Sequence, residues 1–194
     1  NFFIALANRL AGWSAGGPAK VAVISSGGIV LATSLRSAGD EIDEAITSYI
    51  KRKYNVLIGD STAEMLKKNI GSAIPETDRG TMEVRGRNLL NGLPAVITVN
   101  SGEVREAMGE QISRILDCIR ATLEATPPEL SSDIYDTGIM MTGGGAMIPG
   151  LAQLVSRITG IRVMVSKNPM DAVAIGIGRV IDSEMSGVVT FRNK

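Results

Sequence analysis

Three consecutive glycines that directly follow an apolar run restrict the fold of this chain more than any other feature. The run Gly138-Ile139-Met140-Met141 leads into Thr142-Gly143-Gly144-Gly145-Ala146. Glycine has no Cβ, so the backbone can come close to a ligand and can adopt a positive φ. The free amides at the start of a following helix would favour an anion or a polar ligand edge. The pattern therefore indicates a nucleotide-binding turn or, as the simpler alternative, a plain strand-to-helix turn.

Strand-like and helix-like segments alternate along most of the chain, which predicts an α/β layered fold. The segment 72–100 breaks this alternation and is interpreted as an inserted subdomain. Asn91-Gly92 predicts a hairpin turn inside it, and Ser61 with Glu64 predicts a capping box. Strands are expected at 20–25, 29–35, 81–85, 95–99, 138–141 and 162–165. Helices are expected at about 39–53, 61–70, 101–124, 129–132, 150–159 and 169–185.

The composition excludes several classes of function. The chain has no histidine, which rules out Ser-His-Asp or Cys-His catalysis and histidine-ligated metal sites. Its single cysteine, Cys118, cannot form an internal disulfide and fits a reducing cytoplasm. Lys+Arg and Asp+Glu both number 20, so there is no broad basic footprint for nucleic acid, and self-association meets no long-range repulsion.

Glu64, Lys67 and Lys68 lie three and four residues apart, so they share one face of the helix expected at 61–70. One interpretation is a solvent-exposed ion pair. The other is a polar clamp on a ribose or a base, and the spacing alone does not decide between them.

Residues 1–17 do not match the pattern of the rest of the chain. On a helix, Phe2, Phe3, Leu6, Leu10 and Trp13 would share one apolar face. A membrane-surface helix is one interpretation, although Arg9 is its only cation. The alternatives are a helix or strand packed on the main body, or a segment foreign to the fold. The chain begins with Asn1 and is therefore expected to be a fragment.

Several strings resemble the MreB family of bacterial actin homologues, and the resemblance runs from about Lys20 to Ser183. The strings that carry it are Ala38–Ile46, Tyr49–Asn55, Thr62–Glu64, Ile70–Ala73, Met82–Arg87, Pro127–Leu130, Thr142–Ala146, Asn168-Pro169 and Gly176–Gly178. The resemblance covers only the second half of the family's fold. It implies an actin-like, RNase-H-like subdomain IIA at 20–54 and 111–185, and a smaller α+β subdomain IIB at 55–110. Residues 1–19 are then an atypical leading segment, and 186–194 a tail.

The resemblance also implies a site and a function. The expected cofactor is ATP with Mg²⁺, bound on its adenosine side by this half. The implied function is a slow ATPase that assembles into filaments, maintains rod cell shape and directs cell-wall synthesis. The implied partners are further copies of the chain and membrane-anchored cell-shape proteins, in the cytoplasm at the inner membrane, with no nucleic acid. The implied cofactor-binding residues are Gly143, Gly144, Gly145, Ala146, Glu64, Lys67, Lys68, Gly39 and Asp40.

Two departures from the family pattern lead us to expect weak or absent ATPase activity and no catalytic or metal-binding residue in this chain. The half with the first phosphate loop is missing, and Val21-Ala22-Val23 is not preceded by the expected Asp-Ile-Gly-Gly-Gly-Thr-Thr-Glu. Pro18 in that place removes a backbone donor. A frameshifted or mis-joined start would explain residues 1–19. Two alternative functions stay open, an assembly module without ATPase activity and a small-molecule kinase of the actin-like superfamily.

Overall fold

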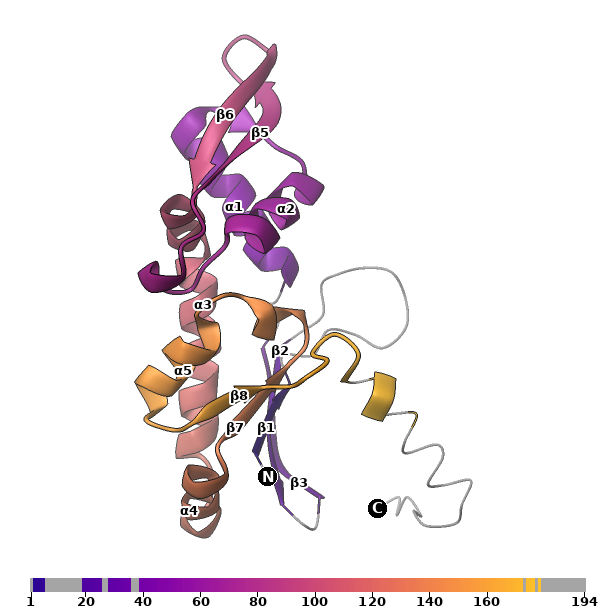
Figure 1. Cartoon of the computed structure of the whole chain (residues 1–194), viewed down its shortest axis with the longest axis vertical. Helices are drawn as coiled ribbons and strands as arrows, with labels where there is room; N and C mark the ends of the chain where they lie inside the picture. The colour runs from indigo at the N-terminus through magenta and orange to yellow at the C-terminus, as the bar shows by residue number, and fades with distance from the viewer. Residues whose placement is uncertain are drawn as a thin grey trace.

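The fold is built on two sheets in a computed structural model that describes residues 2–5, 19–25, 28–35, 39–172, 174–176 and 178. The larger sheet has the order β3-β2-β1-β7-β8 (Figure 1). The central strand β1 (Phe2–Ala5) pairs in parallel with β7 (Ile139–Thr142), which pairs in parallel with β8 (Val163–Val165). On its other side, β1 pairs antiparallel with β2 (Ala19–Ser25), and β2 with β3 (Gly28–Leu35). Strands and helices are mixed as predicted, and the α/β class is confirmed.

The position of β1 decides one of the alternatives for the start of the chain. Residues 2–5 form a strand between β2 and β7, so the helical interpretation is wrong for these residues. An apolar run of this length fits a strand paired on both sides as well as a helix turn, and periodicity does not separate the two. The expected helix positions Leu6, Leu10 and Trp13 lie outside the described residues, as do Pro18 and residues 186–194.

Two long helices connect the two sheets. The helix α1 (Gly39–Tyr54) buries Ile42, Ile46 and Ile50, and α3 (Ser101–Glu124) buries an apolar stripe along one side. Figure 1 shows α3 running from the small upper sheet down to the large one, and Thr122 of α3 donates to Thr33 of β3 over 3.3 Å. The buried members of the α3 stripe are Val104, Met108, Ile112, Ile115, Leu116 and Ile119.

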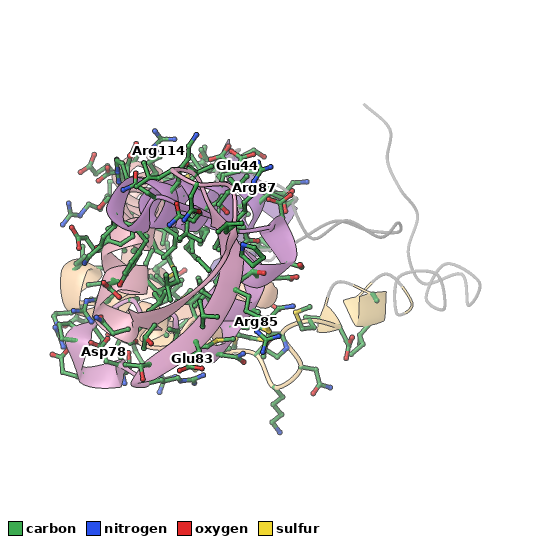
Figure 2. The ribbon with its side chains drawn as sticks, turned by 90° about the horizontal axis from the view of Figure 1, so that it is seen from above. Glu44, Asp78, Glu83, Arg85, Arg87 and Arg114 are labelled. Atoms are coloured by element: carbon green, nitrogen blue, oxygen red, sulfur yellow. The ribbon has the colours of Figure 1, made fainter. Side chains whose placement is uncertain are left out.

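The second sheet has the order β4-β5-β6 and lies at the far end of the molecule from α4 (Figure 1). It consists of β4 (Val56–Leu57), β5 (Thr81–Asn88) and β6 (Pro94–Asn100), all antiparallel. The helix α2 (Asp60–Ile70) and the 3-10 turn η1 (Pro75–Thr77) lie between β4 and β5. The predicted hairpin is confirmed, with Gly92 at φ 73° in its turn. On its solvent side β5 carries the exposed Glu83, Arg85 and Arg87, labelled in Figure 2.

A side-chain cap begins α3, whereas the capping box predicted for α2 is absent. Asn100 caps α3, and Glu103 completes a capping box with it. The predicted capping box at Ser61 and Glu64 is wrong, because Gly59 is the N-cap of α2 and no side chain caps this helix. The amides of Thr62 and Ala63 donate to the Gly59 carbonyl, which places Ser61 inside the first turn.

The last helices differ in length from the prediction. The helix α4 (Pro128–Thr137) extends well beyond the expected 129–132, because Ile134 is buried against the body. The helix α5 (Leu151–Thr159) agrees with the prediction. Of the helix expected at about 169–185, residues 172, 174–176 and 178 are helical, and the remainder of its later part lies outside the described residues. No helix in the described part of the chain is long and apolar enough to cross a membrane.

Candidate functional site

The glycine loop, residues 143–146, begins at the carboxyl end of β7. Gly143 is buried and has φ 83° and ψ 172°, a conformation that is essentially restricted to glycine. Its amide donates to the Pro169 carbonyl over 2.8 Å, and Thr142 Oγ1 donates to the same carbonyl over 3.1 Å. The segment around Pro169 therefore fixes the entrance to the loop.

The glycine loop does not open directly into an α-helix. A short 3-10 turn, η2 (Gly144–Met147), follows, and α5 begins only at Leu151, after Gly150 with φ 79°. The amides of Ala146 and Ile148 donate to the carbonyls of Gly143 and Gly145. The free amides at the start of α5 therefore lie several residues after the glycines. A ligand at the glycine loop would contact mainly backbone atoms.

Gly144 leaves open space on the surface of the glycine loop. A Cβ at this position would meet only the Met170 sulfur, at 3.3 Å. Met170 is 65% exposed, so its flexible side chain can move away. This part of the loop can therefore be approached closely by another molecule.

The three candidate residues on α2 divide into two groups. Lys68 pairs with Glu64 over 2.7 Å, with side-chain exposures of 66% and 32%, which is the solvent-facing ion pair of the first interpretation. The hydrogen bond from Lys68 lowers the pKa of Glu64. Lys67 points the other way, toward α1.

Lys67 joins the start of α1 to α2. Its Nζ lies 2.8 Å from Asp43 Oδ2 and donates to the Gly39 carbonyl over 3.2 Å. The two side chains are only 12% and 11% exposed. Asp40, on the same turn of α1, is exposed. The structure thus brings Gly39 and Lys67 together and adds Asp43, an acid on the otherwise apolar face of α1 that sequence reasoning missed.

A packed connection joins the glycine loop to α2. The Ala73 amide, just after α2, donates to the Pro149 carbonyl, just after η2, over 2.8 Å. A Cβ at Gly150 would lie 2.5 Å from Ile74 Cγ1, so the two segments are in close contact. The segments that follow the glycine loop and α2 are therefore packed against each other, although the two are some 80 positions apart in the sequence, roughly half of a typical domain's length.

Two hollows lie elsewhere on the described chain, and the smaller one, between β2 and α4, is lined by Ser25, Asp133 and Thr137. A shallow hollow between α5 and β8 is lined by Gln153, Arg157 and Arg162, and it contains none of the predicted site residues. Among the residues that the structure describes, no group of three or more Cys, Asp or Glu side chains could hold a metal ion.

The comparison with known families decides the relationship of this chain. The MreB/Mbl protein family matches residues 14–187, slightly more than the span of about 20 to 183 that the sequence predicts. The chain belongs to the MreB/Mbl family. Within that family it is 46% identical over 168 residues to cell shape-determining protein Mbl of Bacillus subtilis, and 46% identical over 167 residues to MreB of Escherichia coli. The matches cover 87% and 86% of this chain but 50% and 48% of those proteins, so the chain spans about half the length of its curated relatives.

Solved structures of MreB proteins confirm the actin-like fold. MreB5 of Spiroplasma citri bound to AMPPNP is 32% identical, with a TM-score of 0.86, over 97% of this chain and 55% of that one. The ADP-bound form of the same protein gives the same TM-score over 95% of this chain. A MamK double helical filament, at 20% identity and a TM-score of 0.71, shares the fold. The match to MreB/Mbl along most of the chain does not favour the small-molecule kinase alternative.

The buried Asp43 predicts a pH dependence of stability. Burial raises the pKa of Asp43, the nearby Glu64 and Asp40 carboxylates add to this, and Lys67 opposes it without cancelling it. Because the folded-state pKa lies above the unfolded value of about 4, the contribution of Asp43 to the free energy of unfolding is full below that value and is lost as the pH rises through the folded-state pKa.

We therefore expect the stability of the wild type relative to Asp43→Asn to increase as the pH is lowered from about 7 to about 4. Urea unfolding of both proteins across this range measures the difference. A difference that stays constant or shrinks on acidification would contradict the assignment.

Proposed function

We propose that this chain forms the adenosine side of an ATP site in an MreB-type bacterial actin. The observation that carries the proposal is the packing of the segment after the glycine loop against the end of α2, which Lys67 joins to the start of α1. Ligands of α/β folds commonly bind at the carboxyl ends of strands, and the glycine loop follows the carboxyl end of β7. The 32% identical MreB5 structures, solved with AMPPNP and ADP, support an adenine nucleotide as the ligand.

The described residues fit the nucleoside part of such a ligand. The glycine loop offers approachable backbone, and the Glu64–Lys68 pair on α2 offers polar groups at the surface. We assign to this site Gly143–Ala146, Glu64, Lys67, Lys68, Gly39 and Asp40. When bound with Mg²⁺, ATP would supply the phosphoanhydride bond. We assign no catalytic or metal-binding residue in this chain. We also assign 20–54 and 111–185 to subdomain IIA and 55–110 to IIB.

Calorimetric titration of the 194-residue chain with ADP tests this proposal. We expect saturable binding with one site per chain, and competition by adenosine. Absence of heat with ADP, or equally strong binding of a pyrimidine nucleotide, would contradict it.

We further propose that the chain takes part in filament assembly, as a cell-shape protein at the cytoplasmic side of the inner membrane together with membrane-anchored partners. The supporting surface is the tip of the β5–β6 hairpin, Leu89–Leu93. Leu90 is 80% exposed and Leu93 61% exposed, although turn bonds to Asn88 and Asn91 hold this tip in a fixed shape. Exposed, ordered apolar groups rimmed by polar residues are typical of protein contacts.

Replacing Leu90 and Leu93 together by serine is expected to reduce self-association. Both side chains are exposed, so each change should alter the free energy of unfolding by no more than about 0.5 kcal/mol. Sedimentation with and without ATP measures assembly, with Tyr135→Ser on α4, also 69% exposed, as the matched control. If the tip variant pellets as fully as the wild type, the hairpin tip is not the contact.

A further inference from the structure

The enclosed ion pair between α1 and α2 gives little support to the fold itself. Asp43 is only 8% exposed, and its second carboxylate oxygen, Oδ1, is buried without a hydrogen-bond partner. Removing a charge from water costs more than one ion-pair contact returns unless the remaining lone pairs are also satisfied. The raised pKa of Asp43 also indicates that the ion pair adds little to stability, because the effect of burial outweighs the attraction of Lys67.

The pair has a clear geometric effect. Lys67 Nζ bonds Asp43 Oδ2 at 2.8 Å and the Gly39 carbonyl at 3.2 Å, so the ammonium is held by two groups one turn apart on α1. Glu64 lies one turn before Lys67 on the same helix. Ala73 lies three residues after the end of α2, and its amide donates to the carbonyl of Pro149, which follows the glycine loop. Lys67 therefore holds α2 against the start of α1, and the Ala73 bond holds the end of α2 against the segment that follows the glycine loop.

We infer that Asp43 is a positioning residue for the nucleoside site: it holds Lys67 against the Gly39 carbonyl and so sets the separation of α1 and α2 around the ligand. This inference rests on the proposed function. Asp43 acts through Lys67 and does not itself contact the nucleotide. An ordered site lowers the entropic cost of binding, because the groups around the ligand need not be immobilised when it arrives.

Asp43→Asn tests the inference, because asparagine keeps the shape of the side chain and replaces the charged carboxylate by a neutral amide. We expect the ADP affinity to fall about tenfold, while the thermal midpoint of the ligand-free chain stays equal or rises near neutral pH. Glu44→Gln is the matched control, since Glu44 is the next residue of α1, is exposed and points outward in Figure 2. This control should bind ADP as the wild type does.

A double-mutant cycle with Lys67→Met separates positioning from plain structural support. If Asp43 acts through Lys67, the double variant binds ADP no more weakly than Lys67→Met alone. Three results would overturn the inference. The losses of ADP affinity could be additive, they could accompany a lowered thermal midpoint, or the ADP affinity of Asp43→Asn could lie within twofold of that of the wild type. A wild type that binds no ADP overturns the proposed function and this inference together, whereas normal wild-type binding with an unaffected Asp43→Asn overturns the positioning role alone.

Discussion

Replacement of Gly144 by valine is expected to abolish detectable binding of adenine nucleotides while the protein remains folded. The valine side chain would fill the open space over the glycine loop, where the only atom within 4 Å of a new Cβ is the sulfur of the exposed Met170 side chain. The loss should exceed about 2 kcal/mol of binding free energy, or roughly thirtyfold in affinity, because contact between ligand and loop backbone would be prevented. Calorimetric titration with ADP measures the affinity, and circular dichroism monitors the fold.

The matched control for this substitution is Gly109→Val on α3. A Cβ at Gly109 meets nothing within 4 Å, and valine and glycine differ by only a few tenths of a kcal/mol in helix propensity. This control should bind ADP normally. If Gly144→Val also binds ADP normally, the glycine loop does not contact the nucleotide.

Replacement of Gly138 by alanine is expected to cause the largest loss of stability. Gly138 has φ 86° and ψ −177°, and a Cβ there would lie 2.6 Å from the Arg162 carbonyl oxygen. That oxygen accepts the Ile139 amide over 2.8 Å at the start of the β7–β8 pairing, so a displaced carbonyl weakens this pairing. An unfavourable backbone conformation costs about 1–3 kcal/mol, and overpacking adds about 1–3 kcal/mol.

Gly160→Ala gives a milder comparison, because Gly160 also has a positive φ but lies in the left-handed helical region, with ψ 7°, which an alanine can adopt. Gly160 ends α5 with φ 71° and has open space where its Cβ would stand. It should lose only about 1–2 kcal/mol, the usual cost of the left-handed conformation. Urea unfolding of both variants gives the comparison, and a loss at Gly138 equal to or smaller than that at Gly160 would contradict the expected cost at Gly138.

The sequence predicts elements well where several local signals agree. The helix α3 combines a cap at Asn100, a continuous apolar stripe and a terminating Pro127-Pro128, and its observed span, Ser101–Glu124, agrees with the prediction. The β5–β6 hairpin combines alternation with an Asn-Gly turn. Local signals fail where tertiary contacts determine the length of an element. In α4, for example, the burial of Ile134 extends the helix.

The central strand β1 shows a second limit. Four apolar residues carry no period that separates strand from helix. Their pairing with β2 and β7 depends on residues about 20 and 140 positions away, and such distant pairing is not encoded in a short pattern.

The candidate site could be predicted only in part, because local patterns identify its residues but not the directions of their side chains. The glycine loop and the α2 residues stand out by type and spacing, and the family resemblance groups them. Their directions did not follow from spacing, because Lys67 and Lys68 are adjacent on α2 but one turns inward to Asp43 and the other outward to Glu64. An acid on the buried face of α1 was the available signal for Asp43, since a buried carboxylate needs a partner.

The most direct test of the adenosine site is to map ADP binding on the backbone amides of the chain by NMR. The proposed site predicts that the amides of Gly143–Ala146, of Glu64–Lys68 and of Gly39-Asp40 shift together and saturate with one common affinity. Shifts confined to other surfaces, such as the hollow at Arg157 and Arg162, or no shifts at all, would contradict it.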